Sequence, residues 1–120
     1  MNIITNNIIT NNIIIHNISN YSYNFNKLLN IKNTIIVKKC NNIDLTINNK
    51  INKIIVENCK NIKINLYSAI IGIEVNKSII DIIIKKNINC IEAYKSTIHI
   101  NKKSKKTKYI LEKSELSING

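Results

Sequence analysis

A short pattern returns along this chain at a nearly constant spacing and constrains the fold more than any other feature. Each copy has an apolar residue, two polar residues and a Cys or Ser, followed by apolar residues in alternation. The Cys or Ser positions are Cys40, Cys59, Ser78, Ser96 and Ser114, at spacings of 19, 19, 18 and 18 residues. A fixed period over five copies predicts a solenoid of stacked units. A sixth copy is expected around Ile18, 22 residues before Cys40.

The apolar residues within each copy alternate, as in Ile43, Leu45 and Ile47 after one Cys and in Ile35 and Val37 before it. This period of two, with many β-branched residues, predicts strands and no helix. Each copy then supplies at least two short strands whose inward residues stack on those of the next copy. The predicted fold class is therefore all-β, a compact parallel β-helix in which each coil has the length of one copy.

The small residues of the pattern should stack in a column inside one turn. Cys40 and Cys59 would then lie about 4.8 Å apart on adjacent coils. This distance allows a disulfide, but a column of small side chains is the favoured interpretation, and the odd number of three cysteines suits a reducing compartment. Val56 and Ile64 should be core residues. Outward positions should form columns too, among them a ladder of Asp44, Lys63, Asp81 and His99.

Length and local composition suggest one folded domain. The predicted division is an Asn- and Ile-rich N-terminal segment at 1–20, which either adds a capping coil or is low-complexity sequence, and a β-helix domain at 21–120. Asn and Thr interrupt the isoleucines of the first segment, so no membrane-spanning segment or leader is predicted. The chain is expected to be soluble, unsecreted and cytoplasmic, with no membrane partner.

The net charge of +11 comes from lysine, because the chain contains no arginine. Such a charge permits an acidic partner or simply a solvated surface. Specific nucleic-acid binding is not expected, since that function favours arginine and aromatic residues gathered on one face. An enzyme is not expected either, because His16 and His99 lie on different coils and no phosphate loop or metal spacing occurs.

Three segments resemble the C-terminal domain of cyclase-associated protein, an actin-regulating family of the cofactor C-like superfamily. Lys50–Lys60 is similar to its "GKINSITVDNCK"-like strand, Ile70–Ser78 to a "VVGIVEIINS"-like strand with the internal Gly72, and Ile35–Cys40 to a "YIYKC" segment. The resemblance runs from about Thr34 to Ile118. It implies a right-handed β-helix of about six coils, in agreement with the repeat count.

The resemblance further implies binding to actin monomers, with ADP-actin preferred, and acceleration of their exchange of ADP for ATP in the cytoplasm, in association with the cytoskeleton. No catalysis, cofactor or metal is implied. The stretch Tyr94–Ser104 lacks the glycine of the corresponding family segment. Family members also continue into a β-hairpin exchanged between two subunits, which is absent before Gly120, so a homodimer by that route has no support here.

The expected contact face consists of outward residues in the segments that match the family best: Lys38, Lys53, Glu57, Glu74, Asn76 and Lys77. Two alternatives remain open. A non-catalytic relative of tubulin-folding cofactor C is one; the GTPase-activating role itself needs an arginine that this chain lacks. A generic β-solenoid interaction module without actin binding is the other.

Overall fold

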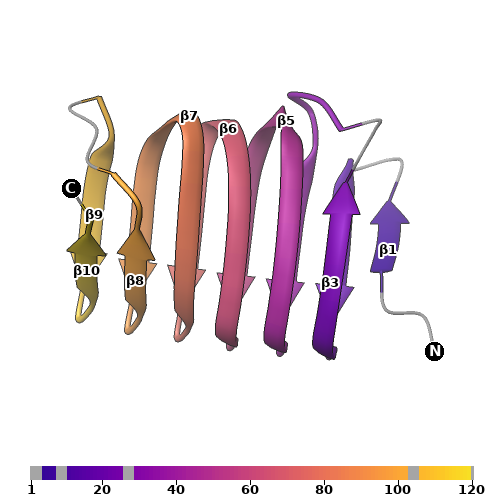
Figure 1. Cartoon of the computed structure of the whole chain (residues 1–120), viewed down its shortest axis with the longest axis horizontal. Coiled ribbons are helices and arrows are strands. Elements are labelled where there is room, and N and C mark those ends of the chain that lie inside the picture. The colour runs from indigo at the N-terminus through magenta and orange to yellow at the C-terminus, as the bar shows by residue number, and fades with distance from the viewer. Residues whose placement is uncertain (1–3, 8–10, 26–28, 103–105, 120) are drawn as a thin grey trace.

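The computed structural model describes residues 11–25, 29–102 and 106–119, together with the backbone of 4–7. Every regular element in these residues is a strand, and nearly all of the strands pair in parallel with the coil above or below. The flattened coils follow one another along a single axis (Figure 1). The predicted all-β parallel β-helix is confirmed. No helix in the described ranges is long and apolar enough to cross a membrane.

Each coil has two faces, joined by a tight corner at the Cys or Ser position. The strands are β1 (Ile4–Asn7), β2 (Asn12–His16), β3 (Ser19–Phe25), β4 (Thr34–Lys38), β5 (Asn41–Glu57), β6 (Lys60–Asn76), β7 (Ile79–Tyr94), β8 (Thr97–Ile100), β9 (Lys108–Glu112) and β10 (Glu115–Ile118). β5, β6 and β7 bend and supply both faces of their coils, with the bends along the upper edge of Figure 1. The solenoid makes about five turns.

We call the strands that lead into the corners the pre-corner face: β2, β4, the second halves of β5 to β7, and β9. They pair in parallel in that order. The post-corner face consists of β3, the first halves of β5 to β7, β8 and β10, which are also parallel. Six strands thus stack on each face in the described residues, as the six repeat copies predict, and the copy around Ile18 forms the first corner.

Register places like residues on like residues in the core. Ile35, Ile54, Ile73 and Ile91 form one inward column of the pre-corner face, and Val37, Val56, Val75 and Ala93 form the next. All eight are at most 5% exposed. Val56 and Ile64 are fully buried, as predicted. The outward ladder of Asp44, Lys63, Asp81 and His99 is also confirmed by the register of the post-corner face.

A column of hydrogen bonds runs through the corners. The backbone N–H of Cys59 donates to Ser78 Oγ at 3.0 Å, that of Ser78 to Ser96 Oγ at 3.1 Å, and that of Ser96 to Ser114 Oγ at 3.0 Å. Cys40 N donates to Cys59 Sγ at 3.3 Å in the same way. Each small side chain therefore satisfies the buried amide of the coil before it. The thiols are free, so the column of small side chains is confirmed and the disulfide is not formed.

The spacing of the corners shortens by one position after Ser78, and this change has a local cause. Ile43 and Ile62 come three positions after their Cys, whereas their register partner Ile80 comes two positions after Ser78. The extra residue is Asn42 or Asn61, with φ of 58° and 55°. Asn tolerates this left-handed conformation better than most residues. The longer coils therefore hold one additional left-handed Asn at the corner.

The N-terminal end differs from the other coils because β1 pairs antiparallel with β2. This position at the end of the stack suits a cap, although part of the Asn-rich repeat lies outside the described residues. A capping role and the division at residue 20, which falls inside β3, stay predictions.

Candidate functional site

Five of the six predicted contact residues lie on the pre-corner face. Lys38, Glu57 and Asn76 are register partners on β4, β5 and β6, and they form one outward column. Lys53 and Glu74 lie further from the corner on β5 and β6. These strands are adjacent, so the five side chains lie within two strand spacings, about 10 Å across the sheet.

Lys77 occupies a different place from the other five. It follows Asn76 directly at the corner, with φ of 50°, and its side chain is exposed. Its backbone N–H donates to the Tyr94 carbonyl at 2.8 Å, which ties the corner to the next coil. Lys77 therefore lies at the edge of the pre-corner face and can contact a partner that covers the corner as well as the sheet.

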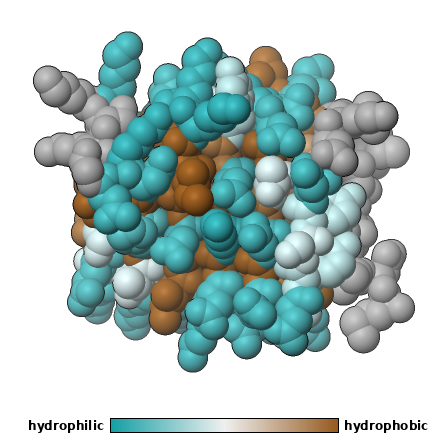
Figure 2. Space-filling model, viewed as in Figure 1, coloured by the Kyte–Doolittle hydropathy of each residue, from teal (hydrophilic) through white to brown (hydrophobic). Residues whose placement is uncertain are grey.

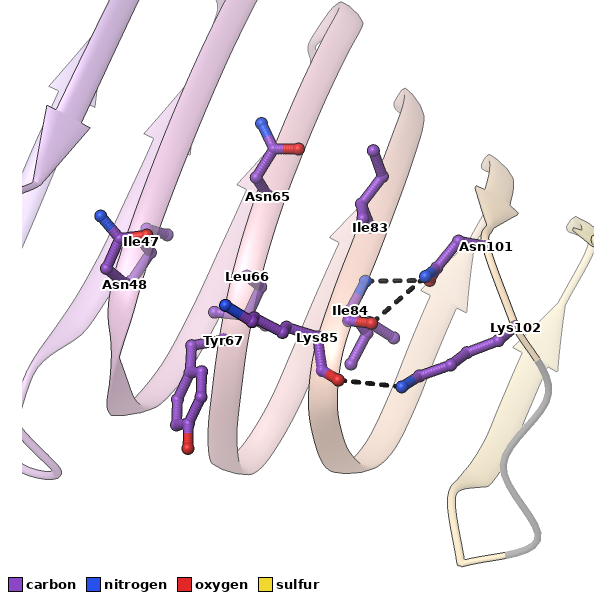
Figure 3. Close-up of a pocket in the computed structure, with 10 residues that line it drawn as sticks. All are labelled: Ile47, Asn48, Asn65, Leu66, Tyr67, Ile83, Ile84, Lys85, Asn101 and Lys102. Atoms are coloured by element: carbon purple, nitrogen blue, oxygen red, sulfur yellow. Dashed lines mark hydrogen bonds between the residues drawn. The ribbon is translucent and has the colours of Figure 1, made fainter.

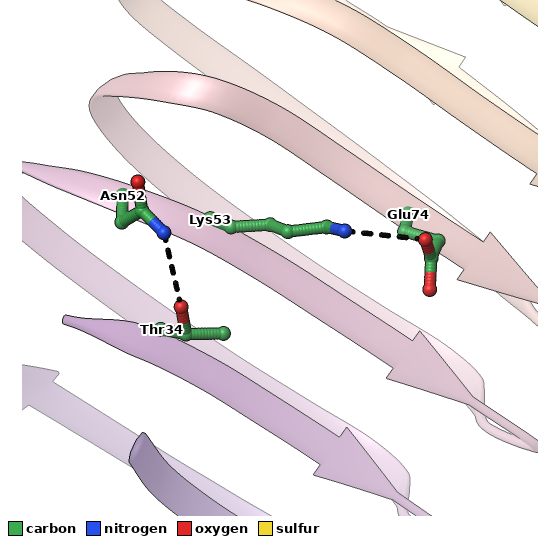
Figure 4. A network of polar contacts seen from close by, with 4 residues as sticks. All are labelled: Thr34, Asn52, Lys53 and Glu74. Carbon is green, nitrogen blue, oxygen red and sulfur yellow. Dashed lines mark hydrogen bonds and ion pairs between the residues drawn. The ribbon is translucent and has the colours of Figure 1, made fainter. Parts of the chain in front are cut away.

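An ion pair joins two of the predicted residues across the coils. Lys53 Nζ lies 3.2 Å from Glu74 Oε1, with side chains that are 24% and 31% exposed (Figure 4). Next to it, Asn52 Nδ2 donates to Thr34 Oγ1 at 3.4 Å. An ion pair with this exposure contributes at most about 1 kcal/mol to stability. A partner that binds Lys53 or Glu74 and breaks this ion pair would therefore reduce the stability of the fold only slightly.

Two further carboxylates lie on this surface and are absent from the predicted contact set. Glu92 pairs in register with Glu74, and Glu112 follows Tyr94 in the column of Asn76. With Glu57 and Glu74 they place four of the chain's seven acidic residues in two neighbouring columns. Glu74, Glu92 and Glu112 line a hollow of about 370 Å³ together with Asn76, Tyr94 and Ile110. The repeat itself indicates both positions: Glu92 lies 18 residues after Glu74, and Glu112 lies 18 residues after Tyr94.

The face offers little for covalent chemistry. Burial, and secondarily the charge of Glu92, raises the pKa of the Cys90 thiol, so the thiol stays protonated and is a poor nucleophile. His16 pairs in register with Lys38 on this face, whereas His99 lies on the post-corner face beside Asp81. No group of three or more His, Cys, Asp or Glu side chains that could hold a metal ion occurs in the described part of the chain. The geometry suits a binding surface.

Comparison with known proteins gives one family. The family model described as "Adenylate cyclase associated (CAP) C terminal" matches residues 5–119. A crystal structure of cyclase-associated protein from Cryptosporidium parvum superimposes with a TM-score of 0.76 at 22% identity, covering 90% of this chain and 70% of that chain. At this identity the likeness shows the shared fold. Comparison with curated protein sequences finds no match.

Proposed function

Because this chain belongs to the C-terminal domain family of cyclase-associated protein, a non-enzymatic family that regulates actin, we propose that it binds actin monomers, prefers those that carry ADP, and accelerates their exchange of ADP for ATP. The family match over residues 5–119 carries this proposal. We place the activity in the cytoplasm, in association with the cytoskeleton.

The proposed contact surface is the pre-corner face around Lys38, Lys53, Glu57, Glu74 and Asn76, with Lys77 at its edge. Both signs of charge occur there, and Lys38 pairs in register with Glu57. A mixed surface of this kind favours one orientation of the partner more than it raises the overall affinity. Binding through it should therefore weaken only moderately with salt, unlike binding driven by the net charge of +11.

A binding protein can accelerate nucleotide release without any catalytic group if it binds one conformation of the actin monomer more tightly than another. On this proposal the protein binds preferentially to a conformation of the actin monomer that releases its nucleotide faster, and it thereby raises the population of that conformation. Each 1.4 kcal/mol of preference shifts the ratio about tenfold. The stacked coils suit this mechanism, because a rigid face holds its contact residues in one arrangement while the partner changes shape.

Release of etheno-ADP from actin monomers tests the proposal. We expect saturable acceleration by this protein and none by a control protein of equal size and charge. The double variant Lys38→Glu and Glu57→Lys keeps the net charge, inverts one register pair, and should abolish the acceleration. Asp44→Lys with Lys63→Asp on the post-corner face also keeps the net charge and inverts one register pair, and this control should leave the acceleration intact. Absence of both binding and acceleration in the unaltered protein would refute the proposal and leave a β-solenoid without an actin partner.

A further inference from the structure

A second hollow lies away from the pre-corner face, where the post-corner strands run into the bends of β5, β6 and β7. It has a volume of about 460 Å³ (Figure 3). We call it the bend groove and define it by Asn65, Tyr67, Ile83, Lys85, Asn101 and Lys102. Among the apolar side chains that line the groove, Leu66 and Ile84 are buried and Ile83 is 40% exposed. Ile83 therefore offers the apolar surface that a ligand can contact. Apolar surface surrounded by hydrophilic side chains is visible from this side in Figure 2.

The rim of the bend groove lies where the register between coils shifts. Leu66 and Ile84 are register partners, but the next pair is Ser68 and Asn87, so Tyr67 on β6 lies opposite two residues of β7, Lys85 and Lys86. The amide side chain of Asn101 continues the ladder beyond β8: its Oδ1 accepts from Ile84 N at 2.9 Å and its Nδ2 donates to Ile84 O at 3.2 Å. Lys102 is thereby held beside Lys85, and its Nζ donates to the Lys85 carbonyl at 2.9 Å.

The charge of the bend groove is uniformly positive. None of the chain's seven acidic residues lines it. Lys86 adds to the charge nearby, with its Nζ 6.0 Å from the centre of the Tyr67 ring. The chain thus separates its charges, with carboxylates concentrated on the pre-corner face and an apolar hollow edged by lysines at the bends.

We propose that the bend groove binds an extended acidic peptide segment that places one apolar side chain on Ile83 and carboxylates beside Lys85 and Lys102. Ile47 and Asn48 of β5 also line the groove, so it crosses four coils, about 14 Å, which is the length of about four extended residues. Asn65 Nδ2 donates to Asp44 Oδ1 at 3.2 Å and to the Leu45 carbonyl at 3.4 Å, so the Oδ1 atom of this amide is the one that can accept from the peptide backbone. A nucleic acid fits less well, because the Tyr67 ring is already partnered by Lys86 and the chain has no arginine.

Fluorescence anisotropy with a labelled hexapeptide of alternating Glu and Leu tests this proposal. The double variant Lys85→Glu and Lys102→Glu should weaken binding at least tenfold. Lys39→Glu with Lys60→Glu changes the charge equally at the corners and should weaken it less than threefold. Ile83→Asn, which removes only the exposed apolar contact, should also weaken it severalfold. Amide chemical shifts should move around Ile83 and Asn101 and remain unchanged on β4.

Several outcomes would overturn the proposal. Equal losses in both double variants would mean general attraction to a basic protein, as would equal binding of a hexapeptide of Glu alone. A hexapeptide in which Gln replaces Glu should bind at least tenfold more weakly, and equal binding would contradict the role of the lysines. Tighter binding of a single-stranded oligonucleotide would identify a different class of partner. Circular dichroism of each variant confirms that the solenoid is intact.

Discussion

Replacement of Ser78 by Ala tests whether hydrogen bonds hold the corners of the solenoid. Ser78 is 2% exposed, its Oγ accepts from Cys59 N at 3.0 Å, and the hydroxyl donates to the Asn76 carbonyl at 2.9 Å. Alanine removes the acceptor and leaves the Cys59 N–H buried without a partner, which costs about 1–3 kcal/mol. For a chain of this length, a loss of about 2 kcal/mol lowers the melting temperature by roughly 8 °C.

Thermal and urea unfolding followed by far-ultraviolet circular dichroism would measure this loss. Ser114→Ala is the matched control: Ser114 Oγ accepts from Ser96 N in the same way, but the residue is only half-buried, so water can replace the hydroxyl. Its cost should stay below about 1 kcal/mol. Ser78→Cys should fall between the two, because Cys59 Sγ already fills the equivalent place beside Cys40 N at 3.3 Å.

The difference in unfolding free energy between the two alanine variants shows whether the hydrogen bonds or packing alone stabilise the corners. A common mechanism of packing alone would make Ser78→Ala and Ser114→Ala equally mild, since each loses one oxygen atom. If they agree within about 0.3 kcal/mol, which is near the limit of additivity for such measurements, the corner column does not stabilise the fold through its hydrogen bonds. The reasoning from buried, satisfied amides would then be wrong.

Three further predictions concern single positions. Gly72→Ala should unfold the chain or cost more than about 3 kcal/mol in urea unfolding, because its φ is 136° and the new Cβ would lie 1.9 Å from the Cys90 carbonyl oxygen; near-native stability would contradict this. Burial raises the pKa of Cys59 from 9.0 to about 11; the folded state therefore keeps its proton more tightly, and the stability of the protein relative to Cys59→Ser should fall between pH 9 and pH 11 and stay constant below pH 9. Lys77→Asn should raise the melting temperature by a few degrees, since Lys77 holds φ at 50°, which costs about 1 kcal/mol for a residue other than Gly or Asn; an unchanged melting temperature would argue against strain there.

The repeated parts of the coil could be predicted from the sequence because every coil meets the same physical demands. A corner needs a small side chain that can accept a hydrogen bond, so Cys40, Cys59 and Ser78 recur at that place. The strands beside it need apolar residues on one side, so Val56 and Ile64 alternate with polar residues. The outward position of Lys38 followed from the same alternation, and its proposed role as a contact residue followed from the family resemblance.

The bends could not be predicted in the same way. The register between β5 and β6 shifts between Ile47 and Lys50 and again between Ile51 and Lys53. The residues that form the bend differ from one coil to the next. No periodic signal therefore marks the positions of Tyr67, Lys85 or Lys102, and the bend groove emerges only from the folded chain. The antiparallel pairing of β1 was also beyond the pattern, because the repeat carries no information about the end of the stack.

The order of charges along the columns bears on both proposed surfaces. A parallel solenoid stacks residues about 4.8 Å apart, so like charges on successive coils repel one another. The post-corner ladder avoids this by placing Lys63 between Asp44 and Asp81. Like charges nevertheless stack where Glu74 pairs with Glu92 on the pre-corner face, where Lys85 lies beside Lys102 in the bend groove, and at successive corners. The corner residues are Lys77, Lys95 and Lys113, whose exposed side chains are screened by solvent. Sequences specify folds by consistent local choices, and violations concentrate where function requires them. The pair of Glu74 and Glu92 and the pair of Lys85 and Lys102 have opposite signs and lie on different sides of the coil, so variants at one proposed surface should leave binding at the other unchanged.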